Sequence, residues 1–386
     1  MAVAGVRGTG NWATSQRPNG FRETILYINP NGDVPLTGLS SKLSSRSLDD
    51  PQWTWFTKPI DVQRLVVTVG ATDSGTSVTV SDNAEITRDG TVMWNYNTGE
   101  RMRSAADGNS GTNVVDTTDR SVGATAAAAI AVDDVLIVIG TSHAENAIAP
   151  TSITFDTSTV TNYTQIHRTP MSISRTARKT RLRTGDAYQQ LKYDILEQHA
   201  QQLERCLFFG EQAAGSGSTP ERLSDGLAVV ATTNTINVGN FTKSQMWDYL
   251  EQAFRYGSME KIGFGGSGAI RELAKFAHNS GSLQIEPGTT EVYGMKLKRM
   301  TTNFGDLLLY RHPLLTDVAE TRNWLIICDM AQLEYGYLDD TMFLTRRMDD
   351  MSRDGTVDEF LTECTLIYGH EQTHAVFQNV NGWTGN

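Results

Sequence analysis

The clearest pattern of apolar and polar positions runs from residue 186 to residue 209. Its apolar side chains recur every three or four residues, which is the spacing of one face of an α-helix. Asp186 precedes the run as an N-cap, and Gly210 follows it as a stop. At 1.5 Å per residue, the pattern predicts an amphipathic helix about 36 Å long.

Residues 64–149 have a different character, with short runs of Val and Thr separated by Gly, Asn and Asp. Closely spaced runs of this kind are typical of strands in a small β domain. The strand candidates are residues 64–69, 77–81, 91–96 and 134–140. We therefore expect a separate all-β unit in this part of the chain.

The other patterned segments mix helices and strands. Four leucines in residues 35–48 fall near one face and predict a short helix, whereas residues 161–176 look extended because they show no 3.6-residue period. Further helices are predicted at residues 244–257 and 269–279, and further strands at residues 53–56, 297–302, 307–312, 323–329 and 358–368. The fold class expected from these patterns is α+β.

Composition and charge argue against some classes of protein. The chain has 386 residues, of which 39% are hydrophobic, and a formal net charge of −11. That charge argues against a broad surface for gripping nucleic acid. No apolar run approaches the roughly 20 residues of a membrane span, so we expect no membrane partner. Residues 1–20 lack the apolar core of a signal peptide and are expected to form an extended arm.

The three cysteines are far apart and show no CxxC spacing. We expect buried free thiols, which suit a reducing cytoplasm.

One motif suggests a metal site. His370, Glu371 and His374 form a complete H-E-x-x-H, which on a helix can bind zinc and supply a general base. A zinc hydrolase of this kind needs a third ligand, and no His, Asp, Glu or Cys follows His374. The favoured interpretation is a turn or short helix without metal, and the zinc metallohydrolase stays as an alternative.

A second motif suggests a nucleotide. Gly263, Gly265 and Gly268 satisfy G-x-G-x-x-G ahead of a predicted helix. The segment before them shows no confident buried strand, so a flexible turn is favoured over a dinucleotide site. No nucleophile and base are grouped elsewhere in the sequence. We therefore expect no enzyme, no cofactor and no catalytic residue.

Charge is unevenly distributed late in the chain. Residues 157–185 contain six Lys or Arg side chains and no Asp or Glu, whereas residues 334–363 are rich in Asp and Glu. The basic run could contact phosphate or an acidic protein surface.

Several blocks, in the same order along the chain, resemble the major capsid proteins of tailed bacteriophages with the Hong Kong 97-type fold. These blocks are residues 41–56, 98–103, 119–140, 161–180 and 354–377. TNYTQIHRTPMSISRTARKT (161–180) is similar to a family branch with an N-Y-T-Q-I-F-R block followed by S-x-T-A, and it runs into the long helix as the family's extended loop runs into its spine helix. His167 stands where that branch commonly has Phe.

The resemblance implies an α+β, Hong Kong 97-type capsid fold with a small β-rich insertion in its extended loop. Its parts would be an N-terminal arm (1–49), the extended loop (50–63 and 150–181), the β-rich insertion (64–149), a peripheral domain with the spine helix (182–222 and 335–386) and an axial domain (223–334).

The resemblance also implies a function. The chain would assemble with itself, as hexamers and pentamers, into an icosahedral virion capsid that encloses double-stranded DNA without sequence-specific binding. Assembly would take place in the host cytoplasm, and scaffolding, portal and decoration proteins are left open as further partners. An encapsulin-like compartment shell of the same fold is the alternative.

The basic run then becomes a hypothesis about contacts between subunits. We expect its residues on an extended strand that returns to the long helix. The residues expected at this contact are Arg175, Arg178, Lys179, Arg181 and Arg183 on one side and Asp349, Asp350 and Asp354 on the other.

Overall fold

The computed structural model describes residues 39, 43–58, 63–154, 157–182, 185–280, 284–292, 295–346 and 355–384. Contacts divide the chain into two compact units, Met1–Trp55 with Thr159–Asn386 (unit 1) and Phe56–Ser158 (unit 2). Unit 1 contains two hydrophobic clusters and unit 2 contains a third. No helix among the described residues is long and apolar enough to span a membrane.

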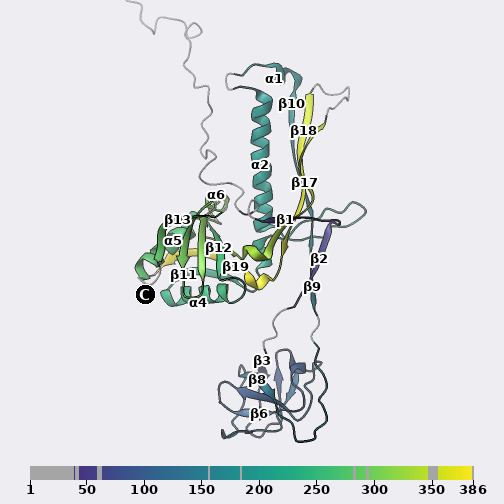
Figure 1. Cartoon of the computed structure of the whole chain (residues 1–386), viewed down its shortest axis with the longest axis vertical. Coiled ribbons are helices and arrows are strands. Elements are labelled where there is room, and N and C mark those ends of the chain that lie inside the picture. Colours follow the sequence, from purple (N-terminus) through teal and green to yellow (C-terminus); the bar gives the residue numbers. More distant parts are fainter. Residues whose placement is uncertain are drawn as a thin grey trace, which may run out of the picture. The chain divides into compact units, whose positions relative to one another are not determined.

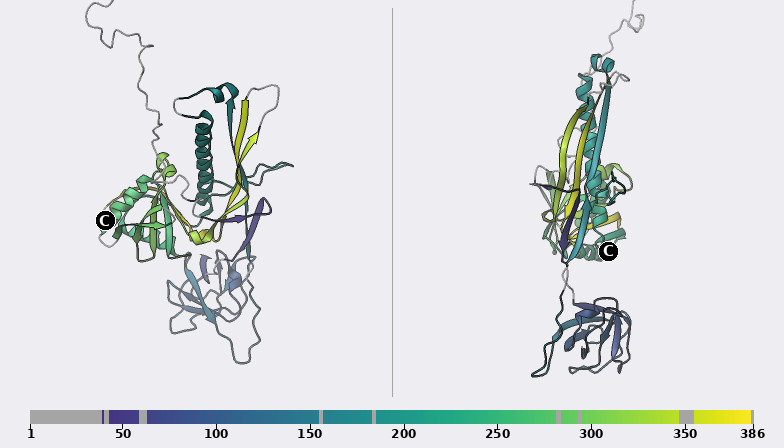
Figure 2. Two further views of the ribbon diagram at one scale, coloured as in Figure 1. Left: turned by 45° about the horizontal axis from the view of Figure 1, so that its top comes forward. Right: turned by 90° about the vertical axis from the view of Figure 1, so that its right-hand side faces the viewer.

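The longest helix of unit 1, α2 (Ala187–Phe209), lies beside a four-stranded sheet (Figure 1). The strand order of this sheet is β1 (Ser44–Ser47), β17 (Leu333–Arg346), β18 (Gly355–Tyr368) and β10 (Gln165–Ser174). Helix α2 contacts β10 and β18, and it runs alongside them in both views of Figure 2. The predicted long helix is confirmed, including Asp186 as its N-cap.

A second sheet of unit 1 has seven strands. Their order is β11 (Thr235–Phe241), β19 (Ala375–Trp383), β16 (Leu325–Cys328), β12 (Glu260–Gly265), β15 (Asp306–Arg311), β14 (Met295–Thr301) and β13 (Gln284–Val292). Strand β19 lies between β11 and β16, two strands of the predicted axial domain (223–334). The predicted division instead places residues 335–386, and β19 with them, in the peripheral domain. Sheet pairing therefore brings the end of the chain into this sheet.

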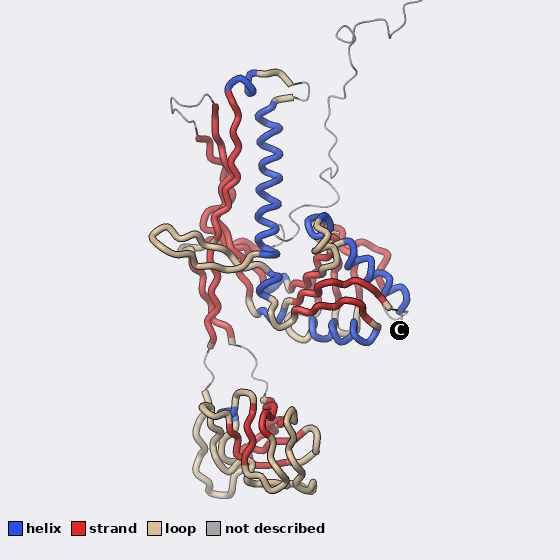
Figure 3. Tube along the Cα trace, turned by 180° about the vertical axis from the view of Figure 1, so that it is seen from behind, coloured by secondary structure: helices blue, strands red, loops and turns tan. Residues whose placement is uncertain are grey.

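Other parts of unit 1 cover both faces of the central strands of the seven-stranded sheet, and Figure 3 shows helices beside this sheet. Leu307 and Leu309 point to one face, which packs against α4 (Lys243–Phe254) and α5 (Ser267–Ser280). Leu308 and Tyr310 point to the other, which packs against the last turn of α2 and α3 (Leu227–Val230). Because successive side chains of a strand alternate between faces, one apolar strand serves both clusters.

The remaining elements of unit 1 are short. Strands β2 (Gln52–Thr57) and β9 (Ser158–Tyr163) form a two-stranded ribbon, and α1 (Arg175–Lys179) follows β10. Helix α6 (Pro313–Asp317) follows β15, and the described residues of unit 1 include the 3-10 helices η4 (Met330–Gln332) and η5 (Glu371–Thr373).

The short helix predicted for residues 35–48 is wrong where the structure describes it. Residues 44–47 form β1, which pairs in parallel with β17 from Ser44↔Glu334 to Ser47↔Tyr337. Backbone pairing with a long strand outweighs the weak helical spacing of the leucines. Residues 1–38, which include most of the expected arm, lie outside the described residues.

A buried carboxylate joins three segments of unit 1. The Oε1 atom of Glu204 on α2 accepts a hydrogen bond from the backbone N–H of Leu39 (2.5 Å) and lies 3.1 Å from Nε2 of His312. The side chains of Glu204 and His312 are fully buried, and Leu39 belongs to the same core. This contact fixes α2 to the strand end before α6.

Unit 2 is a six-stranded sheet with the order β6 (Arg101–Arg103), β5 (Thr91–Asn95), β8 (Val135–Thr141), β3 (Arg64–Val69), β4 (Ser77–Val80) and β7 (Val114–Asp116). A single turn of 3-10 helix, η3 (Ala84–Ile86), adds to it. All four predicted strands are present, so the β-rich prediction is confirmed.

An ion pair between Glu100 and Arg120 fastens the loops of unit 2. The Arg120 guanidinium bonds both Glu100 oxygens, at 2.8 and 2.6 Å. Burial alone would raise the pKa of Glu100, but the hydrogen bonds from Arg120 and from the N–H groups of Ala128 and Ser121 hold it below its ordinary value.

The packing of α2 makes a testable prediction about stability. Leu207 is buried in the core, whereas Leu196 on the same helix is 42% exposed. Replacing Leu207 with Ala leaves a cavity and should lower the free energy of unfolding by about 2–5 kcal/mol. The matched change Leu196→Ala should alter it by no more than about 0.5 kcal/mol. Urea unfolding of the unassembled subunit measures both, and equal losses would contradict this packing.

Candidate assembly surface

A row of polar contacts, which we call the His–Thr seam, holds α2 on the four-stranded sheet. His199 of α2 bonds Thr169 of β10 through Nδ1 and Thr362 of β18 through Nε2, each at 2.8 Å. Thr362 in turn bonds Thr341 of β17 at 2.8 Å. The seam fixes the helix in one register across three strands, because a shift of one residue would leave these buried groups without partners.

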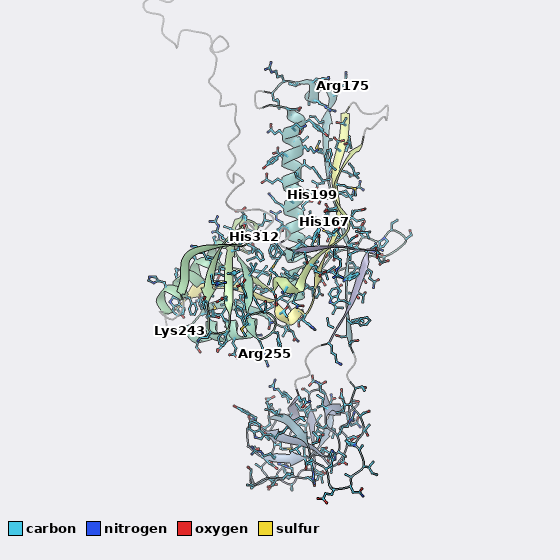
Figure 4. All side chains as sticks on the ribbon, viewed as in Figure 1. His167, Arg175, His199, Lys243, Arg255 and His312 are labelled. Carbon is cyan, nitrogen blue, oxygen red and sulfur yellow. The ribbon has the colours of Figure 1, made fainter. Side chains whose placement is uncertain are left out.

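His167 lies next to this seam on β10, and Figure 4 labels it together with His199. Its side chain is buried, and its Nε2 atom has no hydrogen-bond partner. Burial, together with the neighbouring His199, lowers the pKa of His167 to about 4. Burial likewise lowers the pKa of His199. Both histidines are therefore neutral at pH 7.

The start of α2 is fastened separately. The Asp186 side chain accepts a hydrogen bond from the N–H of Tyr188 (2.8 Å), and the Tyr188 hydroxyl donates one to Asp358 of β18 (2.6 Å). Burial and the Asp358 carboxylate raise the pKa of Tyr188 to about 12. The guanidinium of Arg178 lies 4.9 Å from the centre of the Tyr188 ring. This cluster links α1, α2 and β18.

The basic run predicted for intersubunit contact occupies an exposed end of unit 1. Arg175, Arg178 and Lys179 lie on α1, a single turn capped by the Ser174 side chain, and Arg181 follows it. All residues from 174 to 182 are exposed, and Figure 4 labels Arg175 at the end of β10. The expected extended strand is therefore wrong for residues 175–179, because Ser174 caps the N–H of Ala177 and starts a helical turn.

The predicted acidic partners divide into two groups. Asp349, Asp350 and Asp354 lie outside the described residues, as does Arg183. Other acids of the late stretch bind their own chain. Glu359 receives a bidentate bond from Arg168 at 2.6 and 2.7 Å, and Glu363 accepts from Thr164 at 2.6 Å. The sequence did not reveal these intrachain pairs, because β10 and β18 are far apart along the chain.

The H-E-x-x-H motif spans a 3-10 turn. His370 precedes η5 and is exposed, whereas His374 follows it and is buried. The Nδ1 atom of His374 accepts a hydrogen bond from the N–H of Asp329 (3.3 Å), and Glu371 bonds Thr232 and Thr233. Within the described residues, no three His, Cys, Asp or Glu side chains gather as a metal would require.

A buried lysine supports the same turn. Lys261 is fully buried, and its ammonium donates three hydrogen bonds of 2.7 Å, to the carbonyls of Ala253, Tyr256 and Thr373. Burial lowers the pKa of Lys261 to about 8. Burial and the nearby Lys261 charge lower the pKa of His374 to about 4. The turn is thus built into the core.

The G-x-G-x-x-G segment is a buried strand followed by a helix, so the expected flexible turn is wrong. Gly263 and Gly265 lie on β12, and Gly268 lies in the first turn of α5. A Cβ on Gly268 would lie 1.8 Å from Oδ1 of Asn323. The N–H groups of Gly268 and Ala269 already donate to the carbonyl of Arg322. The glycines allow the chain to pack closely on itself, and the amides that would bind a phosphate are occupied.

The first prediction from this geometry concerns zinc. After extensive dialysis, the protein should hold well under one zinc per chain by elemental analysis, because His370 and His374 face different surroundings. A stoichiometric zinc content that disappears in His374→Ala would contradict this interpretation. As a control, His143→Ala, which removes an exposed histidine of unit 2, should leave the zinc content unchanged.

The second prediction concerns the stability of the subunit at acidic pH. Between the ordinary histidine value of 6.5 and about 4, the unfolded chain binds a proton at His167 that the folded chain does not. The free energy of unfolding should therefore fall as the pH drops through this range. His167→Phe should make this fall shallower, whereas His143→Phe, at an exposed site, should not. Denaturant titrations of the unassembled subunit from pH 7 to 4 test this, and identical slopes in all three proteins would contradict it.

Comparison with known proteins adds independent information. A family model described as SU10 major capsid protein matches residues 6–381. A major capsid protein of Pseudomonas phage PaMx41 is 26% identical over 333 residues, which cover 83% of this chain and 78% of that protein.

Several solved structures are also similar to this chain, at low sequence identity. A structure of Mycobacterium phage Cain has a TM-score of 0.48 at 11% identity and covers 96% of both chains. The capsid of a native GTA particle has a TM-score of 0.45 at 9% identity, covering 95% of this chain and 96% of that chain. An encapsulin complex from Synechococcus elongatus has a TM-score of 0.41 at 11% identity and covers 58% of this chain and 78% of that one.

The family match extends over nearly the whole chain. It confirms the resemblance to phage major capsid proteins and the Hong Kong 97-type fold predicted from it. The chain belongs to the SU10 major capsid protein family.

Proposed function

We propose that copies of this chain form hexamers and pentamers that close into an icosahedral head shell around packaged double-stranded DNA. The observation that carries the proposal is the incomplete burial of α2. None of the residues 187–198 is buried, and Tyr193 and Leu196 are each 42% exposed. The chain itself covers only part of this amphipathic helix. In closed symmetric assemblies, neighbouring copies cover such remaining apolar surface.

The parts of the chain take the roles that the family resemblance assigns. The wall is built by the arm (1–49), the extended loop (50–63 and 150–181), the peripheral domain (182–222 and 335–386) and the axial domain (223–334), and residues 64–149 form the insertion. Strand β19 (Ala375–Trp383) is the exception within 335–386, because it pairs inside the sheet of the axial domain. The chain acts structurally, without catalysis or a cofactor. Assembly takes place in the host cytoplasm, and scaffolding, portal and decoration proteins are left open as further partners.

The net charge of the chain supports a shell wall that encloses DNA without binding it tightly. The formal net charge is −11, so the shell as a whole repels a polyanion. The basic run at residues 175–183, exposed over its described part 175–182, is an exception, and we assign it to a neighbouring subunit. Its partners there are the acids Asp349, Asp350 and Asp354. Each exposed pair contributes only about 0–1 kcal/mol, but the contact repeats at every subunit.

Charge reversal tests this assignment. Arg178→Glu with Arg181→Glu should block shell formation and leave the subunit folded, as seen by electron microscopy and circular dichroism. Asp349→Lys with Asp350→Lys in the same chain should partly restore shells. Contacts should also weaken in 1 M salt, where the Debye length is about 3 Å.

The control changes the net charge equally at exposed positions on β14 and β15, through Lys298→Glu with Arg311→Glu. It should leave assembly intact. If the Arg178 and Arg181 variant builds shells that fail to retain DNA, the basic run faces the genome and the assignment is wrong. Shells that enclose a cargo protein instead of DNA would favour an encapsulin-like compartment.

A further inference from the structure

The sheet of unit 2 has one face that its core does not use. Leu65, Met93 and Leu136 point into the hydrophobic cluster, so their neighbours along β3, β5 and β8 point to the opposite face. Within the described residues of unit 2, the only helix is the single turn η3 (Ala84–Ile86), which contributes to the core side. We call the opposite face the Arg–Trp face and define it by Arg64, Trp94, Tyr96, Arg101, Ile137 and Ile139.

Strand register places four of these residues in one row. Arg101 lies opposite Trp94, Trp94 lies opposite Ile137, and Ile137 lies opposite Arg64. The guanidinium of Arg101 is 5.7 Å from the centre of the Trp94 ring, and the rings of Trp94 and Tyr96 are 5.7 Å apart. Residues directly opposite on one face are in side-chain contact range. The row therefore presents two cations with aromatic and aliphatic surface between them.

The charge of this face is opposite to that of its unit. The sequence of residues 56–158 contains thirteen Asp or Glu and six Lys or Arg. Strands β3, β5, β6 and β8 contain no Asp or Glu. Asp119 binds Arg103 at the outer edge of β6, and Glu100 and Asp134, which flank these strands in sequence, are buried and bonded to Arg120 and Asn95. An anionic surface would thus meet a face that offers cations without acids among them.

Three side chains lack the surroundings that their chemistry favours. The Nε1 atom of Trp94 is buried and has no hydrogen-bond partner, although buried indole N–H groups usually find one. Tyr96 is 63% exposed and Ile139 is 57% exposed. Large apolar side chains on an open sheet face mark an interaction site.

The residue types indicate a protein as the partner. Trp, Tyr and Arg are the side chains that contribute most to protein interfaces, and Lys, Asp and Glu are depleted there. An acidic protein surface also fits the charge of the face. A second copy of this chain offers exposed carboxylates for this contact, because Asp73, Asp82, Asp107 and Asp133 of unit 2 are exposed.

We propose that the Arg–Trp face binds an acidic surface on unit 2 of a second copy of this chain. This inference rests on the proposed assembly, because the shell brings copies together at high local concentration. It adds a contact that does not involve α2 or the basic run of residues 175–183. In this contact, Trp94 and Tyr96 supply apolar area, while Arg64 and Arg101 pair with carboxylates of the second copy.

Photo-cross-linking in assembled shells tests the contact. Benzoylphenylalanine replaces Tyr96, whose exposed aromatic side chain it resembles, in the full chain. Irradiated shells should yield a covalent dimer in which mass spectrometry maps the cross-link to residues 56–158 of the second copy. Arg64→Glu with Arg101→Glu in the same chain should reduce the dimer about tenfold, because it places carboxylates opposite carboxylates.

The control is Lys58→Glu, a charge reversal at an exposed residue of unit 2 outside the Arg–Trp face. It should leave the dimer yield unchanged. Normal shells without a dimer, or with cross-links only to unit 1, would overturn the inference and leave the proposed function intact. Shells that bind heparin through Arg64 and Arg101 without forming the dimer would identify a free anionic polymer as the ligand, which also overturns it. Absence of any shell from the wild-type chain would instead contradict the proposed function, and this inference with it.

Discussion

The packing of α2 on β10 and β18 is the interaction on which the rest of unit 1 depends. The His–Thr seam sets the register of the helix on the sheet, and the buried Glu204 near its end joins it to His312 and Leu39. The same packing covers only one side of the helix. A rigid helix with an uncovered side is a stable element for a wall, because its remaining apolar surface is available to neighbouring copies.

Long-range strand pairing positions everything around that helix. Strand β10 pairs with β18 over ten residues, from Gln165↔Cys364 to Ser174↔Gly355, and β19 returns between β11 and β16. Such pairings close long loops, so their entropic cost is recovered only when the whole unit folds. Unit 2 is different, since its strands pair within residues 64–141 around a core of their own. It is thus suited to insertion into an existing fold.

The sequence predicted local elements well and their partners poorly. Periodicity located α2 and four of the six strands of unit 2, because each of these has a clear apolar spacing of its own. It missed the three-residue strands β6 and β7. It missed β12, because the run Glu260–Gly265 contains two glycines and a lysine, and only the tertiary structure shows that Lys261 finds three buried carbonyls. The seam could have been suspected from His199, a polar residue within the apolar stripe of α2. Its partners Thr169 and Thr362 carry no signal that sequence spacing could reveal. The motifs H-E-x-x-H and G-x-G-x-x-G show the converse, since their sequence pattern does not reveal the hydrogen bonds and close packing that their residues make within the chain.

We infer that α2 and its sheet form a wall in which neighbouring copies cover the side of the helix that one chain leaves exposed. The most direct measurement is a cryo-electron microscopy reconstruction of shells assembled from the purified protein, at a resolution that shows side chains. We expect closed icosahedral particles in which a neighbouring copy covers Tyr193 and Leu196 of α2. Particles in which that side of the helix faces solvent at every subunit position would contradict it.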